Sequence, residues 1–217
     1  MLLRGRLTTS SQWLLLNSYE YFIKAIDGEC ASFVKKISSY DDFEKLGGQL
    51  KTGKYIFQDV IEQSKAMDVI NPASLNTLRI VTINKGENTY VLSSLLRIGT
   101  AKTGNVDNWA AGGLAIGIND DGYLKKYGFY KPTFGLKTDI HPDTNVVFTE
   151  FAVPMYKEAC NLACKAHKVF YDVRAIGWDI AISKDGPIFV EGNDNFEISL
   201  QQACDKPLKA EWIKAME

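Results

Sequence analysis

Residues 175–193 read AIGWDIAISKDGPIFVEGN, and this stretch decides the fold. Two apolar runs flank an Asp-Gly turn, which is a strong signal for a β-hairpin. With the turn centred on Asp185, residues pair symmetrically about it, and Asp179 lies directly opposite Glu191. Alternate residues of one strand share a face, so Asn193 lies on the same side as the two carboxylates.

Two carboxylates that face each other across a strand pair repel, and a cation between them removes that cost. Asp179, Glu191 and Asn193 offer hard oxygen ligands of the kind that Mg²⁺ prefers, with room for phosphate and water. The alternative is a solvent-facing hairpin with scattered acids, but the apolar neighbours Trp178 and Val190 favour a buried strand pair. The sequence therefore predicts a magnesium site on this hairpin.

Composition excludes several classes of protein. The chain has 217 residues, 46% of them hydrophobic, which suits one domain or two small ones with a sizeable core. Its net charge of −1 gives no argument for nucleic-acid binding or for a polybasic membrane surface. No apolar run approaches the roughly 20 residues of a membrane span. The four cysteines are sparse and irregularly spaced, as in proteins of a reducing compartment, so we expect a cytoplasmic protein.

The other apolar segments indicate short strands joined by turns, with few helices. Strands are expected over 21–26, 33–37, 54–61, 76–83, 89–98, 114–118 and 123–130, and helices over 40–51, 154–170 and 201–216. Hairpins outnumber strand–helix–strand units. We therefore expect an α+β fold with mainly antiparallel sheets and flanking helices.

Two strands near the N-terminus carry candidate ligand contacts. Lys24 lies on an apolar strand just before a turn of small and polar residues, where its charge can reach a phosphate. The alternative is an edge-strand lysine kept for solubility. Gln58, Asp59 and Ile61 end a strand and enter a polar loop, where backbone groups can read an adenine edge between apolar walls.

Two further segments leave alternatives open. Arg79 lies inside an alternating strand, and it points either to solvent or into a pocket, where it would bind a phosphate or a substrate carboxylate. Asp107 and Asn108 follow Arg97 in the chain and precede Gly112 and Gly113. Such glycines allow close backbone approach to a ligand, and a surface loop is the equal alternative.

Four stretches, read in order, resemble the ATP-grasp superfamily, and the closest match is its sugar-transfer-associated branch. They are FIKAIDG at 22–28, YIFQDVIEQ through NPASLNTLRIVTI at 55–83, VDNWAAGGLAIGI at 106–118 and IGWDIAISKDGPIFVEGN at 176–193. The last two are the specific ones. The likeness spans about residues 20–204.

The resemblance implies an ATP-grasp-like fold with a nucleotide cleft between two lobes. A small lobe, 1–61, would carry the phosphate flap and the adenine strand, and a large C-terminal lobe, 62–217, would carry the metal-binding hairpin. The implied nucleotide contacts are Lys24 on the phosphates, segment 58–61 at the adenine, Gln63 or a neighbour near the ribose, and Asn108. Arg79 would contact the phosphoryl or acyl-phosphate group, and Asp179, Glu191 and Asn193 would hold two Mg²⁺ ions.

The resemblance also implies an activity. ATP phosphorylates a carboxylate, and an amine or similar nucleophile then displaces phosphate from the acyl phosphate. The implied partners are a small-molecule carboxylate and an amine or sugar substrate, in polysaccharide or cell-surface glycan biosynthesis. Nothing in the sequence indicates an oligomeric state.

Three features depart from the family pattern. The usual Lys-Pro pair is Lys24-Ala25, and the usual Gly-rich flap is only segment 27–32, with one glycine. About 20 residues precede Tyr21, where ATP-grasp enzymes carry an N-terminal domain. The chain therefore looks like the second and third lobes without the first. The alternative function is a truncated or non-catalytic ATP-binding module that needs a missing lobe or a partner.

Overall fold

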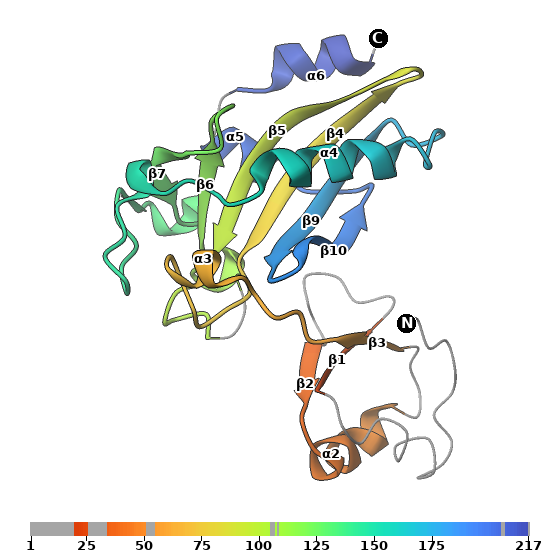
Figure 1. Cartoon of the computed structure of the whole chain (residues 1–217), viewed down its shortest axis with the longest axis vertical. Helices are drawn as coiled ribbons and strands as arrows, with labels where there is room; N and C mark the ends of the chain where they lie inside the picture. The colour runs from red at the N-terminus through yellow and green to blue at the C-terminus, as the bar shows by residue number, and fades with distance from the viewer. Residues whose placement is uncertain are drawn as a thin grey trace. The chain divides into compact units, whose positions relative to one another are not determined.

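The structure is a computed structural model that describes residues 20–25, 34–50, 55–104, 107, 109–204 and 207–216. The chain divides into two compact units, Met1–Ile61 and Glu62–Glu217, and each unit is described by itself (Figure 1). The expected flap at 27–32 and the candidate contact Asn108 lie outside the described residues.

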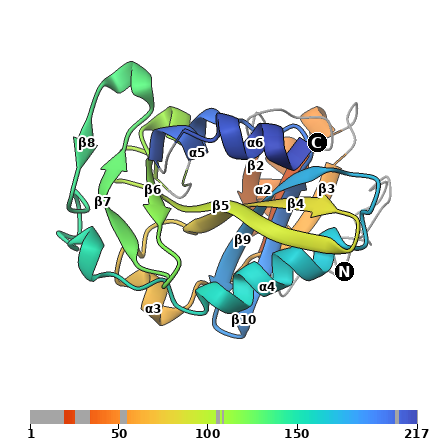
Figure 2. The same ribbon diagram turned by 90° about the horizontal axis from the view of Figure 1, so that it is seen from above.

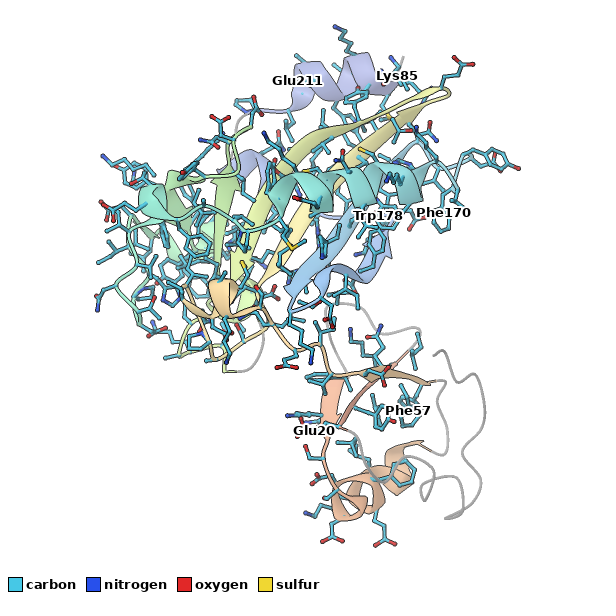
Figure 3. All side chains as sticks on the ribbon, viewed as in Figure 1. Glu20, Phe57, Lys85, Phe170, Trp178 and Glu211 are labelled. Atoms are coloured by element: carbon cyan, nitrogen blue, oxygen red, sulfur yellow. The ribbon has the colours of Figure 1, made fainter. Side chains whose placement is uncertain are left out.

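The first unit contains a three-stranded antiparallel sheet and one helix. The strand order is β2-β1-β3, with β1 at Tyr21–Ala25, β2 at Val34–Ile37 and β3 at Tyr55–Asp59. The helix α2, Tyr40–Leu50, follows β2, and the hydroxyl group of Ser39 accepts a hydrogen bond from the backbone N–H of Asp42 at its start. Ile23 and Ile37 are the buried centre of a small core to which Phe57, labelled in Figure 3, also contributes.

The second unit is built on a seven-stranded sheet in which every pairing is antiparallel, in the order β10-β9-β4-β5-β6-β7-β8. The strands are β4 Thr77–Lys85, β5 Asn88–Ile98, β6 Leu114–Ile118, β7 Leu124–Phe129, β8 Lys137–Thr138, β9 Ala175–Ser183 and β10 Gly186–Asn193. The expected α+β class with mainly antiparallel sheets is confirmed.

Four α-helices and three single 3₁₀ turns complete the described part of this unit. They are α3 Lys65–Asp68, α4 Tyr156–His167, α5 Ser199–Cys204, α6 Lys209–Met216, η1 Trp109–Ala111, η2 Pro132–Phe134 and η3 Phe148–Glu150. The tail that was expected to be helical over 201–216 contains two helices, α5 and α6. Pro207 lies between α5 and α6, and a proline cannot donate the backbone hydrogen bond that a continuous helix needs.

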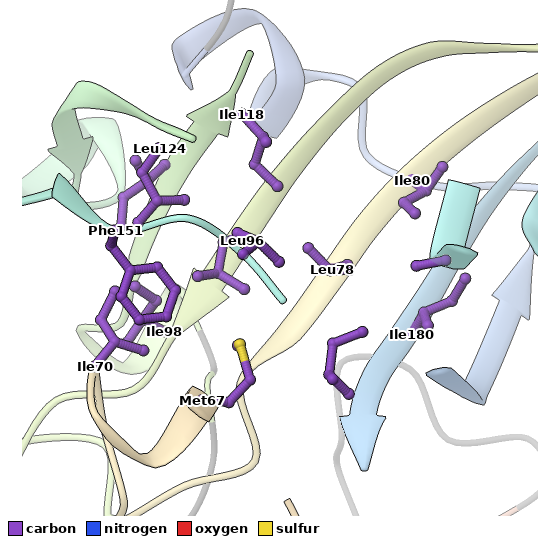
Figure 4. Packing of buried hydrophobic residues seen from close by; sticks show 14 of the residues in the cluster. Met67, Ile70, Leu78, Ile80, Leu96, Ile98, Ile118, Leu124, Phe151 and Ile180 are labelled. Carbon is purple, nitrogen blue, oxygen red and sulfur yellow. The ribbon is translucent and has the colours of Figure 1, made fainter. Parts of the chain in front are cut away.

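Different helices cover the two faces of the seven-stranded sheet. Seen from above, α4 lies on one side of the central strands, and α5 and α6 lie on the other (Figure 2). The α4 face is apolar: Leu78, Ile80, Leu96 and Ile180 form one buried cluster that extends to Phe151 (Figure 4). Trp178 adds ring contacts with Phe189 at 4.9 Å and with Phe170 at 6.1 Å between ring centroids (Figure 3).

The opposite face carries the residues that alternate with this cluster. Leu95 and Ala115 pack there against Leu200 and Cys204 of α5, and Ile83 and Ala175 pack against Ala215 of α6. Between these contacts the face is polar, and it holds the residues described below. No helix in the described part of the chain has the length and apolar character that crossing a membrane requires.

Candidate active site

The β9–β10 hairpin pairs Asp179 with Glu191, as expected, but it does so through a different turn. Ser183 pairs with Gly186, so the turn is the two residues Lys184 and Asp185 and is not centred on Asp185. A β-bulge between Phe189 and Glu191 then shifts the register by one residue. Without that bulge Glu191 would lie on the α4 face, because side chains alternate along a strand.

A second bulge acts in the same way on β5. Val81 pairs with Ser93 and Thr82 pairs with Val91, which leaves Leu92 as the extra residue. Beyond it, Arg97 lies opposite Thr77 and therefore on the same face as Arg79. Without the extra residue Arg97 would lie on the apolar face. The two bulges thus bring charged side chains of β5 and β10 to one face of the sheet.

Asp179 is at the centre of the charged group on this face, and its side chain is only 3% exposed. Arg79 of β4 donates to it twice, from Nε to Oδ1 at 2.5 Å and from Nη2 to Oδ2 at 3.0 Å. Arg97 of β5 adds a third hydrogen bond, from Nη1 to Oδ2 at 2.9 Å. Burial alone would raise the pKa of Asp179, but the hydrogen bonds and charges of Arg79 and Arg97 hold this pKa below its ordinary value.

Asp107 extends the group into the segment between β5 and β6. Arg97 donates from Nη2 to Asp107 Oδ1 at 3.1 Å, and the hydroxyl group of Thr77 donates to Oδ2. Burial raises the pKa of Asp107, against the opposing charge of Arg97. The sequence left this segment open between a ligand contact and a surface loop. The structure places Asp107 in the charged group, with its side chain 12% exposed.

Glu191 and Asn193 form the open side of the group. Glu191 is exposed, it pairs with Asp179 across the hairpin, and its Oε1 accepts a hydrogen bond of 3.1 Å from Asn193 Nδ2. No three or more His, Cys, Asp or Glu side chains among the described residues gather as a metal site. A cation here would therefore take the amide oxygen of Asn193 as its third protein ligand. This set of hard oxygen donors fits Mg²⁺, which usually keeps several waters and binds one or two carboxylates.

Four hydrogen bonds join the side chain of Gln63 to neighbouring residues. Its Nε2 donates to Asp68 Oδ1 at 3.0 Å and to the Asn71 carbonyl at 3.1 Å. Its Oε1 accepts from the backbone N–H and the side-chain N–H of Asn76, at 2.7 and 3.0 Å. An amide side chain has two donors and about two acceptor positions, so no capacity is left for a ribose hydroxyl group.

The candidate residues of the first unit lie on and after β1 and β3. Gln58 pairs with Phe22, and Lys24 follows Phe22 by two residues, so Lys24 and Gln58 share one face of the three-stranded sheet. Asp59 pairs with Tyr21 and lies on the other face, with Ile23. Ile61 follows the end of β3. The remaining candidates, from Gln63 onward, belong to the second unit.

Comparison with known proteins gives the family. The family model described as "Sugar-transfer associated ATP-grasp" matches residues 9–216. The chain belongs to the sugar-transfer-associated ATP-grasp family. The resemblance seen in the sequence is therefore confirmed, over nearly the whole length of this ATP-grasp protein.

Solved structures show the same fold at low sequence identity. The ATP-grasp ligase PsnB, complexed with a minimal precursor, has a TM-score of 0.54 and 12% identity; the match covers 100% of this chain and 54% of that one. The biotin carboxylase domain of 2-oxoglutarate carboxylase from Hydrogenobacter thermophilus, complexed with MgADP, ADP and bicarbonate, has a TM-score of 0.53 and 11% identity over 91% and 36%.

A third structure is a carboxyaminoimidazole ribonucleotide synthase from Aspergillus clavatus complexed with ATP. Its TM-score is 0.51 at 11% identity, and the match covers 90% of this ATP-grasp protein and 40% of the synthase. The chain thus spans about half or less of the length of these structures. No curated protein matches its sequence.

Proposed function

We propose that this ATP-grasp protein is an ATP- and Mg²⁺-dependent ligase that joins a small-molecule carboxylate to an amine or similar nucleophile through an acyl phosphate. The observation that carries the proposal is the pair of facing carboxylates, Asp179 and Glu191, beside Arg79 on the polar face of the sheet. Family membership and the fold shared with ATP-grasp enzymes support it.

The charge of the group supports a cation. Asp107, Asp179 and Glu191 supply three carboxylates, and Arg79 and Arg97 supply two guanidinium groups, so three negative charges against two positive ones leave one net negative charge. We assign Asp179, Glu191 and Asn193 as the ligands of two Mg²⁺ ions. Bound magnesium offsets the charge on the phosphate oxygens of ATP.

The nucleotide contacts of the proposal are those that the resemblance implies. Lys24 places a point charge on the phosphates, and the segment with Gln58, Asp59 and Ile61 reads the adenine through its backbone groups. Asn108 is a further contact, and a neighbour of Gln63 takes the ribose. These assignments rest on the family resemblance.

The protein's part in the reaction is positioning and charge neutralisation. Asp179 holds the guanidinium group of Arg79 in place. This fixed positive charge stabilises the negative charge that is transferred when an oxygen of the substrate carboxylate attacks the terminal phosphorus of ATP. ADP leaves, the amine attacks the acyl carbon and releases a proton to water, and inorganic phosphate leaves with the bonding electron pair. A cytoplasmic setting and an amine or sugar acceptor in polysaccharide or cell-surface glycan assembly complete the proposal.

Trapping of the acyl phosphate tests the reaction. The chain is incubated with ATP, Mg²⁺, hydroxylamine and a panel of sugar acids and amino acids, and both ADP and hydroxamate are measured. We expect a carboxylate-dependent hydroxamate, in equal amount to ADP, from the wild-type chain and none from Glu191→Gln. Carboxylate-dependent ADP formation without hydroxamate would contradict an acyl-phosphate mechanism.

The second candidate is a non-catalytic ATP-binding module that needs a further lobe or a partner. The single glycine of segment 27–32 favours it, since ATP-grasp enzymes have a Gly-rich phosphate flap there. Mg²⁺-dependent ATP binding with neither ADP nor hydroxamate formation, for every carboxylate of the panel, is its signature.

A further inference from the structure

Arg97 bridges two buried carboxylates that come from distant parts of the second unit. One N–H group of its guanidinium contacts Asp179 on β9, at 2.9 Å, and another contacts Asp107 in the segment before β6, at 3.1 Å. The side chain of Arg97 is 18% exposed. A planar guanidinium fixes the directions of its N–H groups, so a bridge of this kind sets the orientation of both partners.

The bridge limits how Asp179 can bind a cation. A carboxylate offers about four acceptor positions. Arg79 takes one on Oδ1 and one on Oδ2, and Arg97 takes a second on Oδ2. One position on Oδ1 is then left, and Asp179 can contact a cation through a single oxygen.

The segment that carries Asp107 is itself anchored. The hydroxyl group of Thr100 donates to the Gly112 carbonyl at 3.1 Å, and Asn71 Nδ2 donates to the Gly99 carbonyl at 3.0 Å. The hydroxyl group of Thr77 also holds Asp107. Arg97 is therefore braced from the side away from Asp179, and its position depends on the segment between β5 and β6.

We propose that Arg97 is a positioning residue for the cation: braced by Asp107, it turns Asp179 so that Oδ1 is the oxygen that binds the metal. The proposal goes beyond the ligand assignment and rests on the proposed function in one respect, since it takes Asp179 as a ligand of the cation. Partners that orient a metal ligand typically change metal affinity roughly 10- to 100-fold when they are removed.

The opposite role for Arg97 is a direct contact with a phosphate of the nucleotide. The two roles predict different effects of Asp107→Asn, one on the affinity for the cation and the other on the affinity for the nucleotide. If Arg97 positions Asp179, loss of the Asp107 charge loosens the bridge and weakens cation binding. If Arg97 binds phosphate, the same substitution frees its guanidinium and strengthens nucleotide binding.

Mn²⁺ alone is the probe, because oxygen ligands that suit Mg²⁺ also suit Mn²⁺ and its binding is read directly by electron paramagnetic resonance. We expect Arg97→Lys and Arg97→Gln to weaken Mn²⁺ binding by roughly 10- to 100-fold, and Asp107→Asn to weaken it by less. Arg174→Lys is the matched control, since Arg174 contacts the Asn84 carbonyl and takes no part in the charged group. It should leave Mn²⁺ affinity unchanged.

Further readouts separate the outcomes. Urea unfolding of each variant shows whether it is folded, and the conservative Asp107→Asn decides the matter if both Arg97 variants fail to fold. Unchanged Mn²⁺ affinity in Asp107→Asn, or a wild-type chain that binds no Mn²⁺, would overturn the inference. Titration with ATP in Mg²⁺ tests the proposed function separately: a chain that binds Mn²⁺ but no ATP contradicts the function, while the Mn²⁺ data still decide the role of Arg97.

Discussion

The two faces of the seven-stranded sheet use the same strands for different purposes. On β4, Leu78 is fully buried in the cluster under α4, while its neighbours Thr77 and Arg79 belong to the charged group on the other face. On β9, Trp178 packs against Phe170 and the next residue, Asp179, binds two arginines. The α4 face therefore holds the largest apolar cluster, and the other face holds the charged group between two smaller apolar clusters.

The bulges show which face is under special constraint. The extra residues at Leu92 and between Phe189 and Glu191 leave the apolar cluster continuous, but they change which side chains reach the polar face. Bulges re-aim side chains at a local cost in ladder hydrogen bonds. Substitutions on the two faces should therefore separate stability from ligand binding.

The largest expected effect is on the polar face, at Glu191. Glu191→Gln removes the exposed carboxylate of the candidate metal site and leaves the fold intact. We expect Mg²⁺-dependent ATP binding to be lost, a greater effect than the roughly 10- to 100-fold caused by loss of an outer partner. Calorimetric titration measures it, with Glu87→Gln at the exposed β4–β5 turn as the matched control. Unchanged Mg·ATP affinity would show that Glu191 is not a ligand of the metal.

The matching change on the apolar face is Leu78→Ala, one residue from both Thr77 and Arg79. Truncation of a fully buried leucine leaves a cavity and costs about 2–5 kcal/mol of unfolding free energy. Urea unfolding measures that loss, and the Mg·ATP dissociation constant of the folded variant should equal that of the wild type. A large loss of affinity in a folded Leu78→Ala variant would show that the faces are not separable.

The three-stranded sheet repeats the contrast on a smaller scale, since Ile23 is buried and Lys24 lies on the opposite face. Lys24→Ala should weaken ATP binding roughly 10- to 100-fold, the size of a hydrogen bond to a charged group at about 1.5–3 kcal/mol. Adenosine binding should not change, because adenosine has no phosphates. Equal losses for ATP and adenosine would show that Lys24 does not act through the phosphates.

The smallest expected effect is a pH dependence from the apolar face. Trp178 Nε1 donates to the hydroxyl group of Thr82, this hydroxyl group shares a hydrogen bond of 2.7 Å with His167 Nδ1, and His167 Nε2 donates to the Val173 carbonyl. Burial disfavours the charged imidazolium and lowers the pKa of His167 below its ordinary value of 6.5.

The sign of the dependence follows from the lowered pKa. Below pH 6.5 the unfolded chain binds this proton more readily than the folded one, so the unfolding free energy falls as the pH drops. Proton NMR resolves the titration cleanly, since the chain has 2 histidines. A His167 resonance that titrates at or above pH 6.5 in the folded protein would contradict the lowered pKa.

The strands and their antiparallel pairing could be predicted from alternation and turn residues, and so could the facing pair Asp179 and Glu191. The prediction of that pair assumed a turn centred on Asp185, which is wrong. The bulge between Phe189 and Glu191 shifts the register by one residue and restores the same pairing. The place of Arg97 could not be predicted, because an extra residue such as Leu92 leaves no mark in a pattern of alternating apolar residues. The resemblance assigned Gln63 or a neighbour to the ribose. The hydrogen bonds of Gln63 to Asp68 and Asn76 could not be predicted, because the fold brings these residues together.

Calorimetric titration of ATP into the purified 217-residue chain, with Mg²⁺ and with EDTA in its place, tests the metal site on the polar face most directly. We expect saturable binding that requires Mg²⁺ in the wild type and is absent in Glu191→Gln. ATP binding that is equally strong in EDTA, or no binding by a chain shown to be folded, would contradict the claim that the polar face of the sheet binds the metal–nucleotide complex.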